Sequence, residues 1–297
     1  MAKSTLTFDN REGWIWFNGS FVPWKEATSH VISQGLHYAS AVFEGERAYN
    51  GKIFKSNEHT ERLFKSAKIV GIKIPYTKDE INKAKDDLLR KMNLKNCYVR
   101  PIVWRGSTQM GLSTSNADIN VAIAVWDDWA SYFKIEDRLQ GLKLITSPWK
   151  RPSPETAPSD AKASGPYIIC TMSKEYAEQK GYHDALMLDY RNYVAEGTGA
   201  NIFFVKGKNI DTPIADCFLN GITRQTVITM VKKQGFNLVE KHILPNEIRN
   251  YDEAFLTGTA AEITPIKSID DIKYATGKNT TSYKLMNDFT DLVNSSI

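Results

Sequence analysis

The sequence predicts an α+β protein with two domains. The chain has 297 residues, which is more than one small core requires. Helix-capping patterns occur along it together with short runs of β-branched and aromatic residues. A more charged stretch follows these first elements and precedes a second set. We therefore expect a small α/β domain at residues 1–130, a linker at 131–138, and a larger β-rich domain with flanking helices at 139–297.

The N-terminal elements have clear local signals. Residues 14–24 predict a β-hairpin, because Asn18 and Gly19 accept the positive φ that its two-residue turn requires. Asn57 is expected to cap a helix at residues 58–69. Thr77 and Glu80 form a capping-box pattern at the start of the next helix. Residues 97–104 and 119–126 are apolar and β-branched, which predicts two strands.

The C-terminal half predicts further strands joined by three helices. Pro166 suits the first turn of a helix, because its φ is already helical. The stretch 150–160 contains Pro152, Pro154 and Pro158 and is expected to be loop. The predicted strands are 142–147, 183–189, 202–205, 237–244, 254–257 and 263–269, and the predicted helices are 167–180, 223–234 and 282–293.

Composition excludes several classes of protein. Hydrophobic residues make up 42% and charged residues 24%, which is typical of a globular protein. The net charge of +4 comes without a basic block, so we expect no nucleic-acid surface. No apolar run is long enough for a membrane span, and the N-terminus has no apolar signal core. Three cysteines without a C-x-x-C pattern predict buried thiols in a reducing cytoplasm. The five histidines lack metal-ligand spacing, so no metal site is expected.

The stretch 161–201 carries the candidate chemistry. Lys162 precedes the predicted helix, and Glu196 follows the strand that returns from it. An amine and a carboxylate on such elements can converge on one pocket, and a pyridoxal phosphate enzyme needs both groups. Two simpler readings remain open. Lysines are commonly solvated surface charges, and Glu196 could merely cap the turn at residues 197–199.

Two glycine-containing motifs suit a bound anion or ligand. Gly221, Ile222 and Thr223 stand at the start of a predicted helix, where backbone N–H groups and the helix dipole attract a phosphate. Gly258 begins a run of small residues after a predicted strand, where the backbone can approach a ligand closely.

Several motifs together resemble the branched-chain amino acid aminotransferases, in the class IV fold type of pyridoxal phosphate enzymes. The resemblance spans nearly the whole chain, and the motifs occur in family order. It implies a two-domain fold like that of D-amino acid aminotransferase. The motifs are W-F-N-G at 16–19, V-F-E-G at 42–45, Y-V-R-P at 98–101, A-K-A-S-G at 161–165, A-E-G-T-G-A-N at 195–201, N-G-I-T-R at 220–224 and G-T-A-A-E-I-T-P at 258–265.

The resemblance also implies residue roles. Lys162 would form the Schiff base with pyridoxal 5'-phosphate and move the substrate proton, Glu196 would pair with the ring nitrogen, and Tyr167 would hydrogen-bond the ring hydroxyl. The rest of the implied cofactor site is Arg62, Leu219, Gly221, Ile222, Thr223, Gly258 and Thr259, with Arg62 as the phosphate arginine. The implied substrate site is Tyr38, Phe43, Arg47, Tyr98, Arg100, Tyr132, Thr259 and Ala260.

In the family, Tyr38 and the loop at residues 110–112 reach into the neighbouring subunit's site, so a homodimer or a higher oligomer such as a hexamer is expected.

The implied reaction is transfer of the amino group from leucine, isoleucine or valine to 2-oxoglutarate, in two ping-pong half-reactions that give a 2-oxo acid and L-glutamate. The alternatives on the same scaffold are an aminotransferase of D-amino acids or (R)-amines and an enzyme like aminodeoxychorismate lyase. The resemblance argues against these alternatives, because the family links Tyr98 and Arg100 to the pocket for L-amino acids. Trp104 and Arg105 depart from the family pattern, in which these positions usually carry an apolar residue and no cation. Arg47 and Arg105 could also be surface ion pairs.

Overall fold

The computed structural model describes residues 7–127 and 133–295, and the chain divides into two compact units. The first unit is Met1–Trp129 with Ala161–Gly165, and the second is Ala130–Asp160 with Pro166–Ile297. Each unit combines helices with a sheet, so the α+β class is confirmed. Two details of the expected division differ. Residues 161–165 belong to the first unit, and helix α4 (Ile135–Gln140) begins inside the stretch expected to be a linker. Residues 131 and 132 of that stretch lie outside the described residues.

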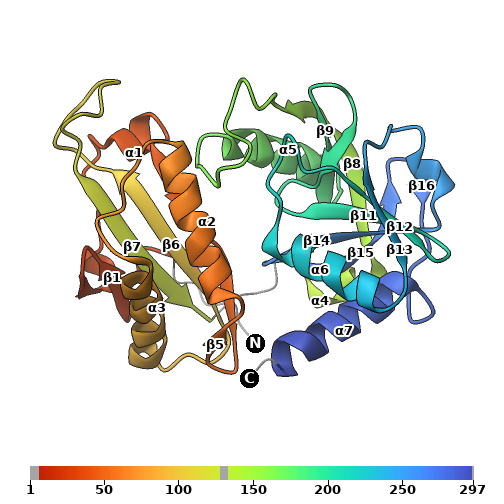
Figure 1. Ribbon diagram of the computed structural model, residues 1–297, viewed down its shortest axis with the longest axis horizontal. Coiled ribbons are helices and arrows are strands. Elements are labelled where there is room, and N and C mark those ends of the chain that lie inside the picture. Colours follow the sequence, from red (N-terminus) through yellow and green to blue (C-terminus); the bar gives the residue numbers. More distant parts are fainter. Residues whose placement is uncertain (1–6, 128–132, 296–297) are drawn as a thin grey trace. The chain divides into compact units, whose positions relative to one another are not determined.

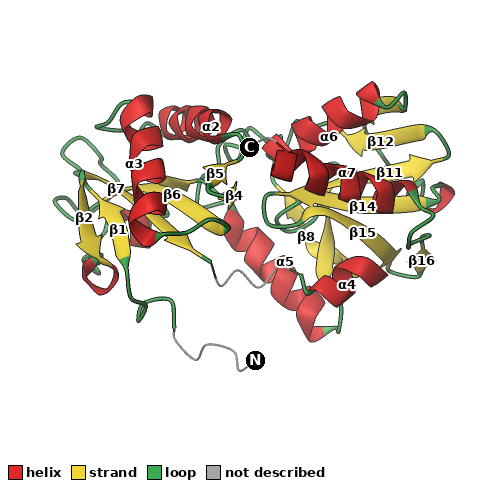
Figure 2. Cartoon of the chain, turned by 90° about the horizontal axis from the view of Figure 1, so that it is seen from below, coloured by secondary structure: helices red, strands yellow, loops and turns green. Residues whose placement is uncertain are grey.

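The first unit is built on a seven-stranded sheet with the order β2-β1-β7-β6-β4-β5, in which β3 also pairs with β6. Strands β6 and β7 of this sheet are labelled in Figure 1. Helices α2 and α3 cover one face of this sheet (Figure 2). The elements are β1 (Trp14–Phe17), β2 (Ser20–Pro23), η1 (Trp24–Glu26), α1 (Gln34–His37), β3 (Ala41–Phe43), β4 (Glu46–Tyr49), β5 (Lys52–Ile53), α2 (Ser56–Ile69), α3 (Lys78–Met92), β6 (Cys97–Arg105) and β7 (Ile119–Trp126).

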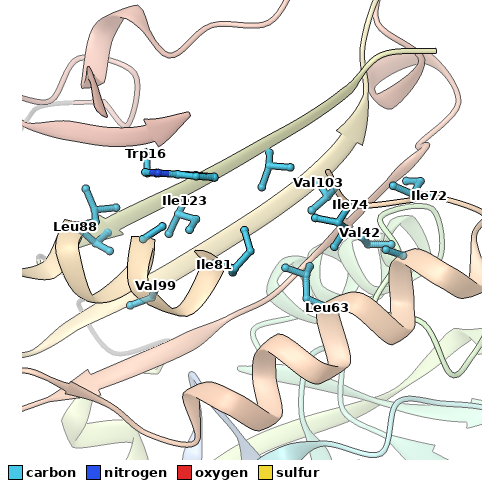
Figure 3. Packing of buried hydrophobic residues seen from close by; sticks show 14 of the residues in the cluster. Trp16, Val42, Leu63, Ile72, Ile74, Ile81, Leu88, Val99, Val103 and Ile123 are labelled. Carbon is cyan, nitrogen blue, oxygen red and sulfur yellow. The ribbon is translucent and has the colours of Figure 1, made fainter. Parts of the chain in front are cut away.

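The core of the first unit lies between the sheet and the two helices. Alternate side chains of each strand point to opposite faces, so Val99 and Val103 of β6 are buried on the helix side. They pack there with Leu63 of α2 and with Ile81 and Leu88 of α3 (Figure 3). All five side chains are fully excluded from solvent. This apolar layer fixes which residues of β6 remain on the opposite face.

Most local predictions for this unit are confirmed. Phe17 pairs with Ser20, so Asn18 and Gly19 form the two-residue turn, with φ of 47° and 92°. The capping box is present at the start of α3, where Thr77 and Glu80 each bond the other's backbone. The Asn57 cap is wrong. Helix α2 begins at Ser56, and Asn57 accepts a side-chain hydrogen bond from Asn82 of α3.

The second unit contains a nine-stranded sheet with the order β10-β9-β8-β15-β14-β11-β12-β13, and β16 pairs with β15. An additional pairing of β10 with β11 closes six of these strands into a ring. The elements after α4 are β8 (Leu142–Arg151), α5 (Tyr167–Gln179), β9 (Asp184–Asp189), β10 (Val194–Glu196), β11 (Asn201–Lys206), β12 (Asn209–Pro213), α6 (Ile222–Lys233), β13 (Asn237–Lys241), η2 (Ile248–Asn250), β14 (Glu253–Gly258), β15 (Glu262–Ile269), β16 (Ile272–Lys273) and α7 (Thr281–Ser295).

The strands of this ring bury side chains on both faces. Ile202 and Phe204 of β11 pack with Leu256 of β14 in one apolar cluster. Their neighbours Phe203 and Phe255 are also fully buried and stack with ring centroids 5.0 Å apart. Strand β8 runs to Arg151, four residues beyond the predicted end, with an irregular register that accommodates Pro148. Within the described ranges, no helix is both long and apolar enough to cross a membrane.

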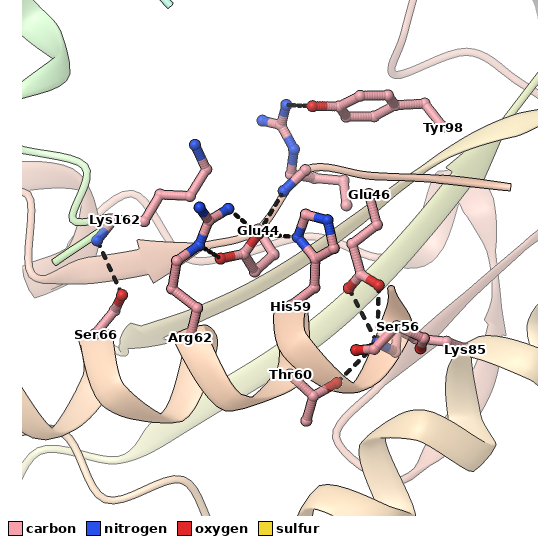
Figure 4. Close-up of polar contacts among 12 residues, drawn as sticks. Glu44, Glu46, Ser56, His59, Thr60, Arg62, Ser66, Lys85, Tyr98 and Lys162 are labelled. Carbon is pink, nitrogen blue, oxygen red and sulfur yellow. Dashed lines mark hydrogen bonds and ion pairs between the residues drawn. The ribbon is translucent and has the colours of Figure 1, made fainter. Parts of the chain in front are cut away.

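A buried ion pair joins helix α3 to the sheet of the first unit. The Lys85 amine donates to both carboxylate oxygens of Glu46, at 2.9 and 3.1 Å, and both side chains are fully buried. The same amine donates to the Thr60 hydroxyl and the Ser56 carbonyl of α2 (Figure 4). Burial raises the pKa of Glu46. Loss of either charge would therefore leave its partner buried and uncompensated.

We expect Lys85→Met to lower the free energy of unfolding by about 3–5 kcal/mol, the usual cost of breaking a buried ion pair. Urea unfolding followed by circular dichroism measures it. The matched control is Lys83→Met on the same helix, because the Lys83 amine is exposed and its described ion pair is with Asp87, one turn along the helix. Equal effects of the two substitutions would contradict a special role for Lys85.

Candidate active site

Lys162 lies in the first unit, on a short extended segment that continues its sheet. The Phe43 amide donates to the Lys162 carbonyl at 3.1 Å, and the Lys162 amide donates to the Ser66 hydroxyl of α2 at 2.9 Å. These two bonds fix the backbone of the lysine from a strand and from a helix. Its amine lies 4.9 Å from the centroid of the Phe43 ring. The sequence alone could not show this placement, because the bonding partners are distant along the chain.

The amine of Lys162 has an unusual electrostatic environment. Desolvation, and then the nearby Arg62 guanidinium, lower the pKa of Lys162 to about 8. The Glu44 carboxylate acts in the opposite direction. A lysine amine is nucleophilic only when it is neutral, and this pKa makes a large neutral fraction available at mildly alkaline pH. The reading of Lys162 as an ordinary solvated surface charge does not fit this environment.

Arg62 is held by a buried carboxylate. Glu44 is fully buried and accepts hydrogen bonds from Nε and Nη2 of Arg62, at 2.6 and 2.8 Å, and from Nδ1 of His59 at 2.7 Å (Figure 4). Burial alone would raise the pKa of Glu44, but Arg62 and then His59 hold the pKa below its usual range. The two-point contact fixes the plane of the guanidinium. A guanidinium held in one orientation is a cation suited to phosphate or carboxylate recognition.

Three residues implied for the substrate site gather on the sheet face opposite the helices. Arg100 and Tyr98 alternate with the core residues of β6, and the Arg100 guanidinium lies 5.0 Å from the Phe43 ring and 5.2 Å from the Tyr98 ring. Nη2 of Arg100 also lies 3.4 Å from the Tyr98 hydroxyl. That hydroxyl occupies the place of a side chain at Gly45, where a Cβ would lie only 2.0 Å away. Gly45 is therefore needed to admit Tyr98.

The other implied substrate residues are less closely associated. Tyr38 directly follows α1 in the same unit and is 45% exposed. Arg47 of β4 pairs with Tyr98 across the sheet, and its guanidinium lies 5.0 Å from the Tyr49 ring. Tyr132 lies outside the described residues. The alternative of a surface ion pair fails for Arg105, which is 8% exposed and donates to neutral oxygens.

Glu196 occupies the end of β10 in the second unit and is buried. Its carboxylate accepts a hydrogen bond from Nδ2 of Asn201 at 3.2 Å, and Nε of Arg151 lies 3.4 Å away. Glu196 pairs with Asn201 across the strands, and Asn201 pairs with Thr257. The carboxylate is therefore held by neighbouring strands in a positive environment. A simple turn cap does not require such burial.

Asn201 also joins Glu196 to the start of helix α6. Its Nδ2 donates to the Leu219 carbonyl at 3.0 Å, and its Oδ1 accepts from the Gly221 amide at 3.1 Å. A Cβ at Gly221 would lie 2.4 Å from that oxygen, so glycine is required here. Ile222 and Thr223 form the first turn of α6 and are buried.

The remaining implied cofactor residues also lie in the second unit. Tyr167 begins α5 and contributes to the electrostatic environment of Arg151. Gly258 ends β14, and Thr259 and Ala260 form the turn into β15. The motifs that we expected to approach a ligand therefore occupy the start of α6 and the end of β14, both next to Asn201 in the hydrogen-bond or strand pattern.

Three supporting residues were not assigned from the sequence. Glu44 and Asn201 stand inside the motifs V-F-E-G and A-E-G-T-G-A-N, so the motifs contained a signal for them. Arg151 stood in the stretch expected to be loop and had no signal. Each supporting residue fixes a side chain with an expected role: Glu44 holds Arg62, and Asn201 and Arg151 flank Glu196.

We expect Glu44→Gln to lower the pKa of Lys162 below its value of about 8, because the substitution removes a negative charge and leaves the Arg62 cation uncompensated. The measurement is the pH dependence of Lys162 modification by an amine-reactive reagent in the cofactor-free protein, read by peptide mass spectrometry. The midpoint should move to lower pH. Glu61→Gln, an exposed change on α2, is the control and should leave it in place. An unmoved midpoint in Glu44→Gln would contradict this electrostatic coupling.

Comparison with known proteins identifies the family. The family model for class IV amino-transferases matches residues 41–269. The branched-chain-amino-acid aminotransferase of Pseudomonas aeruginosa is 43% identical over 293 residues, covering 97% of this chain and 95% of the relative. The corresponding Escherichia coli K12 enzyme is 37% identical over 271 residues, covering 89% and 87%.

Solved structures give the same result. The T.th. branched-chain amino acid aminotransferase, complexed with N-(5'-phosphopyridoxyl)-L-glutamate, has a TM-score of 0.90 and 35% sequence identity, covering 97% of this chain and 96% of the other. The branched-chain aminotransferase of Thermoproteus uzoniensis, solved with norvaline, also has a TM-score of 0.90 and 35% identity, covering 96% of each chain. These likenesses confirm the fold that the sequence motifs implied. The chain belongs to the class IV aminotransferase family.

Proposed function

We propose that this enzyme transfers the amino group of leucine, isoleucine or valine to 2-oxoglutarate, giving the 2-oxo acid and L-glutamate in two ping-pong half-reactions. The named relatives support this substrate class, and one solved relative carries a phosphopyridoxyl adduct of glutamate. The observation in this structure that carries the proposal is Lys162, whose amine has a pKa of about 8 beside Arg62, Phe43 and Tyr98.

The donor groups of the chain fit pyridoxal 5'-phosphate. Lys162 supplies an amine for the aldehyde, Arg62 a planar cation for the phosphate, and Glu196 a buried acid for the ring nitrogen. When bound, the cofactor supplies a ring that accepts the electron pair left when the substrate Cα–H bond breaks. The other residues proposed to hold it are Tyr167, Leu219, Gly221, Ile222, Thr223, Gly258 and Thr259.

Lys162 would carry the proton in this reaction. A neutral amine would accept a proton from the substrate Cα and deliver it to the C4′ carbon of the cofactor, and desolvation favours that neutral form. Glu196 would hold a proton on the ring nitrogen, because an opposite charge nearby favours the protonated form of a base. Asn201 restrains the carboxylate of Glu196 by a hydrogen bond. The proton from the substrate Cα is thus assigned to Lys162, and the proton on the ring nitrogen to Glu196.

Phe43, Tyr98 and Arg100 are the proposed donor pocket in the first unit. The aromatic faces suit an aliphatic side chain, and the Arg100 cation suits the second carboxylate of glutamate. Such a surface can accept both partners of the reaction. Tyr38, Arg47, Tyr132, Thr259 and Ala260 are the further residues proposed to complete it.

The proposed assembly is a homodimer or a larger homo-oligomer in the cytoplasm. Large apolar side chains are exposed in the first unit, with Leu36 71% and Leu112 83% accessible. An apolar cavity of about 450 Å³ lies beside Leu36, lined by residues such as Phe17, Ile102 and Trp104. A second copy of the chain is proposed to cover this apolar surface.

The buried thiols support a reducing compartment, and burial raises the pKa of Cys97 to about 12.

A donor panel with 2-oxoglutarate as acceptor tests the function. We expect turnover with leucine, isoleucine and valine, and none with D-alanine, (R)-1-phenylethylamine or 4-amino-4-deoxychorismate. We also expect Arg100→Ala to lower kcat/KM for glutamate by roughly ten- to a hundredfold, because it removes a charge-assisted hydrogen bond to a carboxylate. The loss for leucine should be smaller.

Two results would contradict these expectations. Preferred use of the D-amino acid or the (R)-amine would favour the alternative enzymes of this scaffold. Equal losses for glutamate and leucine in Arg100→Ala would assign a structural role to Arg100. Arg90→Ala, an exposed change on α3, is the matched control and should leave both donors unaffected.

We expect Glu196→Gln to retain the cofactor but to lower turnover at least about a hundredfold, which corresponds to about 3 kcal/mol in the barrier. The substitution keeps the size of the side chain and removes its charge. Cleavage of the Cα–H bond should become slower, so α-deuterated leucine should show a larger kinetic isotope effect. Glu178→Gln, an exposed change on α5 in the same unit, is the control. Near-normal turnover with an unchanged isotope effect would remove Glu196 from the proposed role.

A further inference from the structure

Two irregular segments of the first unit carry Leu36 and Leu112, the two most exposed large apolar side chains among its described residues. One is the segment from Ser33 to Ser40, which includes the four-residue helix α1 and Tyr38. The other is the loop at residues 106–118 between β6 and β7, which carries Leu112. Both segments lie within the described residues and outside the strands of the sheet, so contacts other than strand pairing must determine their conformations.

A single buried side chain connects the two segments. Gln34 is 1% exposed, and its Nε2 donates to the Gly111 carbonyl at 3.0 Å and to the Ser113 carbonyl at 2.8 Å. These two carbonyls flank Leu112. Both are acceptors, so the NH₂ group of the amide must face them, and both of its hydrogens are used. The Gln34 backbone amide also donates to the Gly106 carbonyl at the start of the loop.

The segment that carries Gln34 is itself fixed to the end of β6. Arg105 donates from Nη1 to the Ser40 hydroxyl at 2.5 Å and from Nη2 to carbonyls at the end of α2. The Arg105 amide donates to the Ser40 carbonyl, and the Arg105 carbonyl accepts from the Ser33 hydroxyl. Both ends of the segment from Ser33 to Ser40 are therefore hydrogen-bonded to Arg105.

Trp104 determines the approach of α1 to the sheet. A Cβ at Gly35 would lie 2.8 Å from Cδ1 of Trp104, so the helix contacts the indole through its backbone.

The loop at residues 106–118 also has internal hydrogen bonds, since the Gln109 side chain accepts from the Asn116 amide, and Thr108 donates to the Asp118 carboxylate. These bonds stay within the loop. Among the described residues, the side-chain hydrogen bonds that connect the tip of the loop to α1 are those of Gln34.

We propose that Gln34 is a positioning residue that holds Leu112 and its neighbours in a fixed place relative to Tyr38. The inference rests on the proposed function, which assigns Tyr38 to the donor site, and it adds the loop around Leu112 to that site. Arg105 and Trp104 supply the base on which α1 rests, and Gln34 transmits that position to the loop. Trp104 and Arg105, which differ from the family pattern, thereby influence the donor site through α1 and not through the residues proposed to hold the cofactor.

The test compares Gln34→Met with Gln109→Met in the full-length enzyme loaded with cofactor. Gln34→Met keeps the length of the side chain and removes both donors, whereas Gln109→Met removes an amide whose described bond, from the Asn116 amide, stays within the loop. Hydrogen exchange read by mass spectrometry reports the loop, and kinetics with leucine report the donor site. We expect Gln34→Met to speed exchange at residues 110–114 and to raise KM roughly tenfold, the scale of two lost hydrogen bonds. kcat and the cofactor Kd should stay within about twofold of the wild type, because the bonds lost lie outside the cofactor residues.

Two outcomes would overturn the inference. Unchanged exchange in Gln34→Met would show that the amide does not hold the loop, and faster exchange with an unchanged KM would show that the loop does not serve the donor site. A wild-type enzyme inactive with all three branched-chain donors would instead overturn the proposed function, and the exchange comparison would still decide whether Gln34 holds the loop. If Gln34→Met does not fold, Gln34→Asn keeps an amide that is too short to reach both carbonyls and should give the same changes.

Discussion

The first unit depends on two buried carboxylates that stand two residues apart on one segment. Glu44 bonds Arg62 and His59 of α2, and Glu46 bonds Lys85 of α3. Two buried negative charges this close would be unfavourable without cations, and each charge obtains its cation from a different helix. Electrostatics therefore fixes both helices against the strands, in addition to apolar packing. The same segment carries Phe43, so the acidic pair also positions the wall of the proposed donor pocket.

The parts of the fold that the sequence predicted well are those whose causes are local. The Asn18-Gly19 turn follows from the φ angles that these two residues accept, and the Thr77–Glu80 capping box from a reciprocal pair of hydrogen bonds within one turn. Strands β6 and β7 follow from their β-branched runs. The fold class came from a family resemblance, which carries information that no single motif contains, and the roles that it implies for the cofactor residues stay predictions.

The predictions that failed required information from elsewhere in the chain. Lys55 takes a left-handed conformation at the N-cap, so α2 begins at Ser56, and the Asn57 side chain accepts a hydrogen bond from Asn82 of a different helix. Strand β8 continues through Pro148 because its partner β9 still pairs beyond an irregular register. Arg151 becomes a neighbour of Glu196 only through that continuation. Such contacts are decided by tertiary structure, so residue type and spacing could not reveal them.

The return of residues Ala161–Gly165 to the first unit has a consequence for biosynthesis. The chain leaves this unit at Trp129, forms Ala130–Asp160, and comes back for five residues. Until then, the Phe43 amide lacks the Lys162 carbonyl, and the Ala41 carbonyl lacks the Ser164 amide. An emerging N-terminal segment therefore cannot complete its hydrogen bonds on the ribosome before the excursion has been translated and the loop closed. The segment that completes this unit is also the one that brings in the reactive lysine, so the amine acquires its lowered pKa only after the surrounding scaffold has formed.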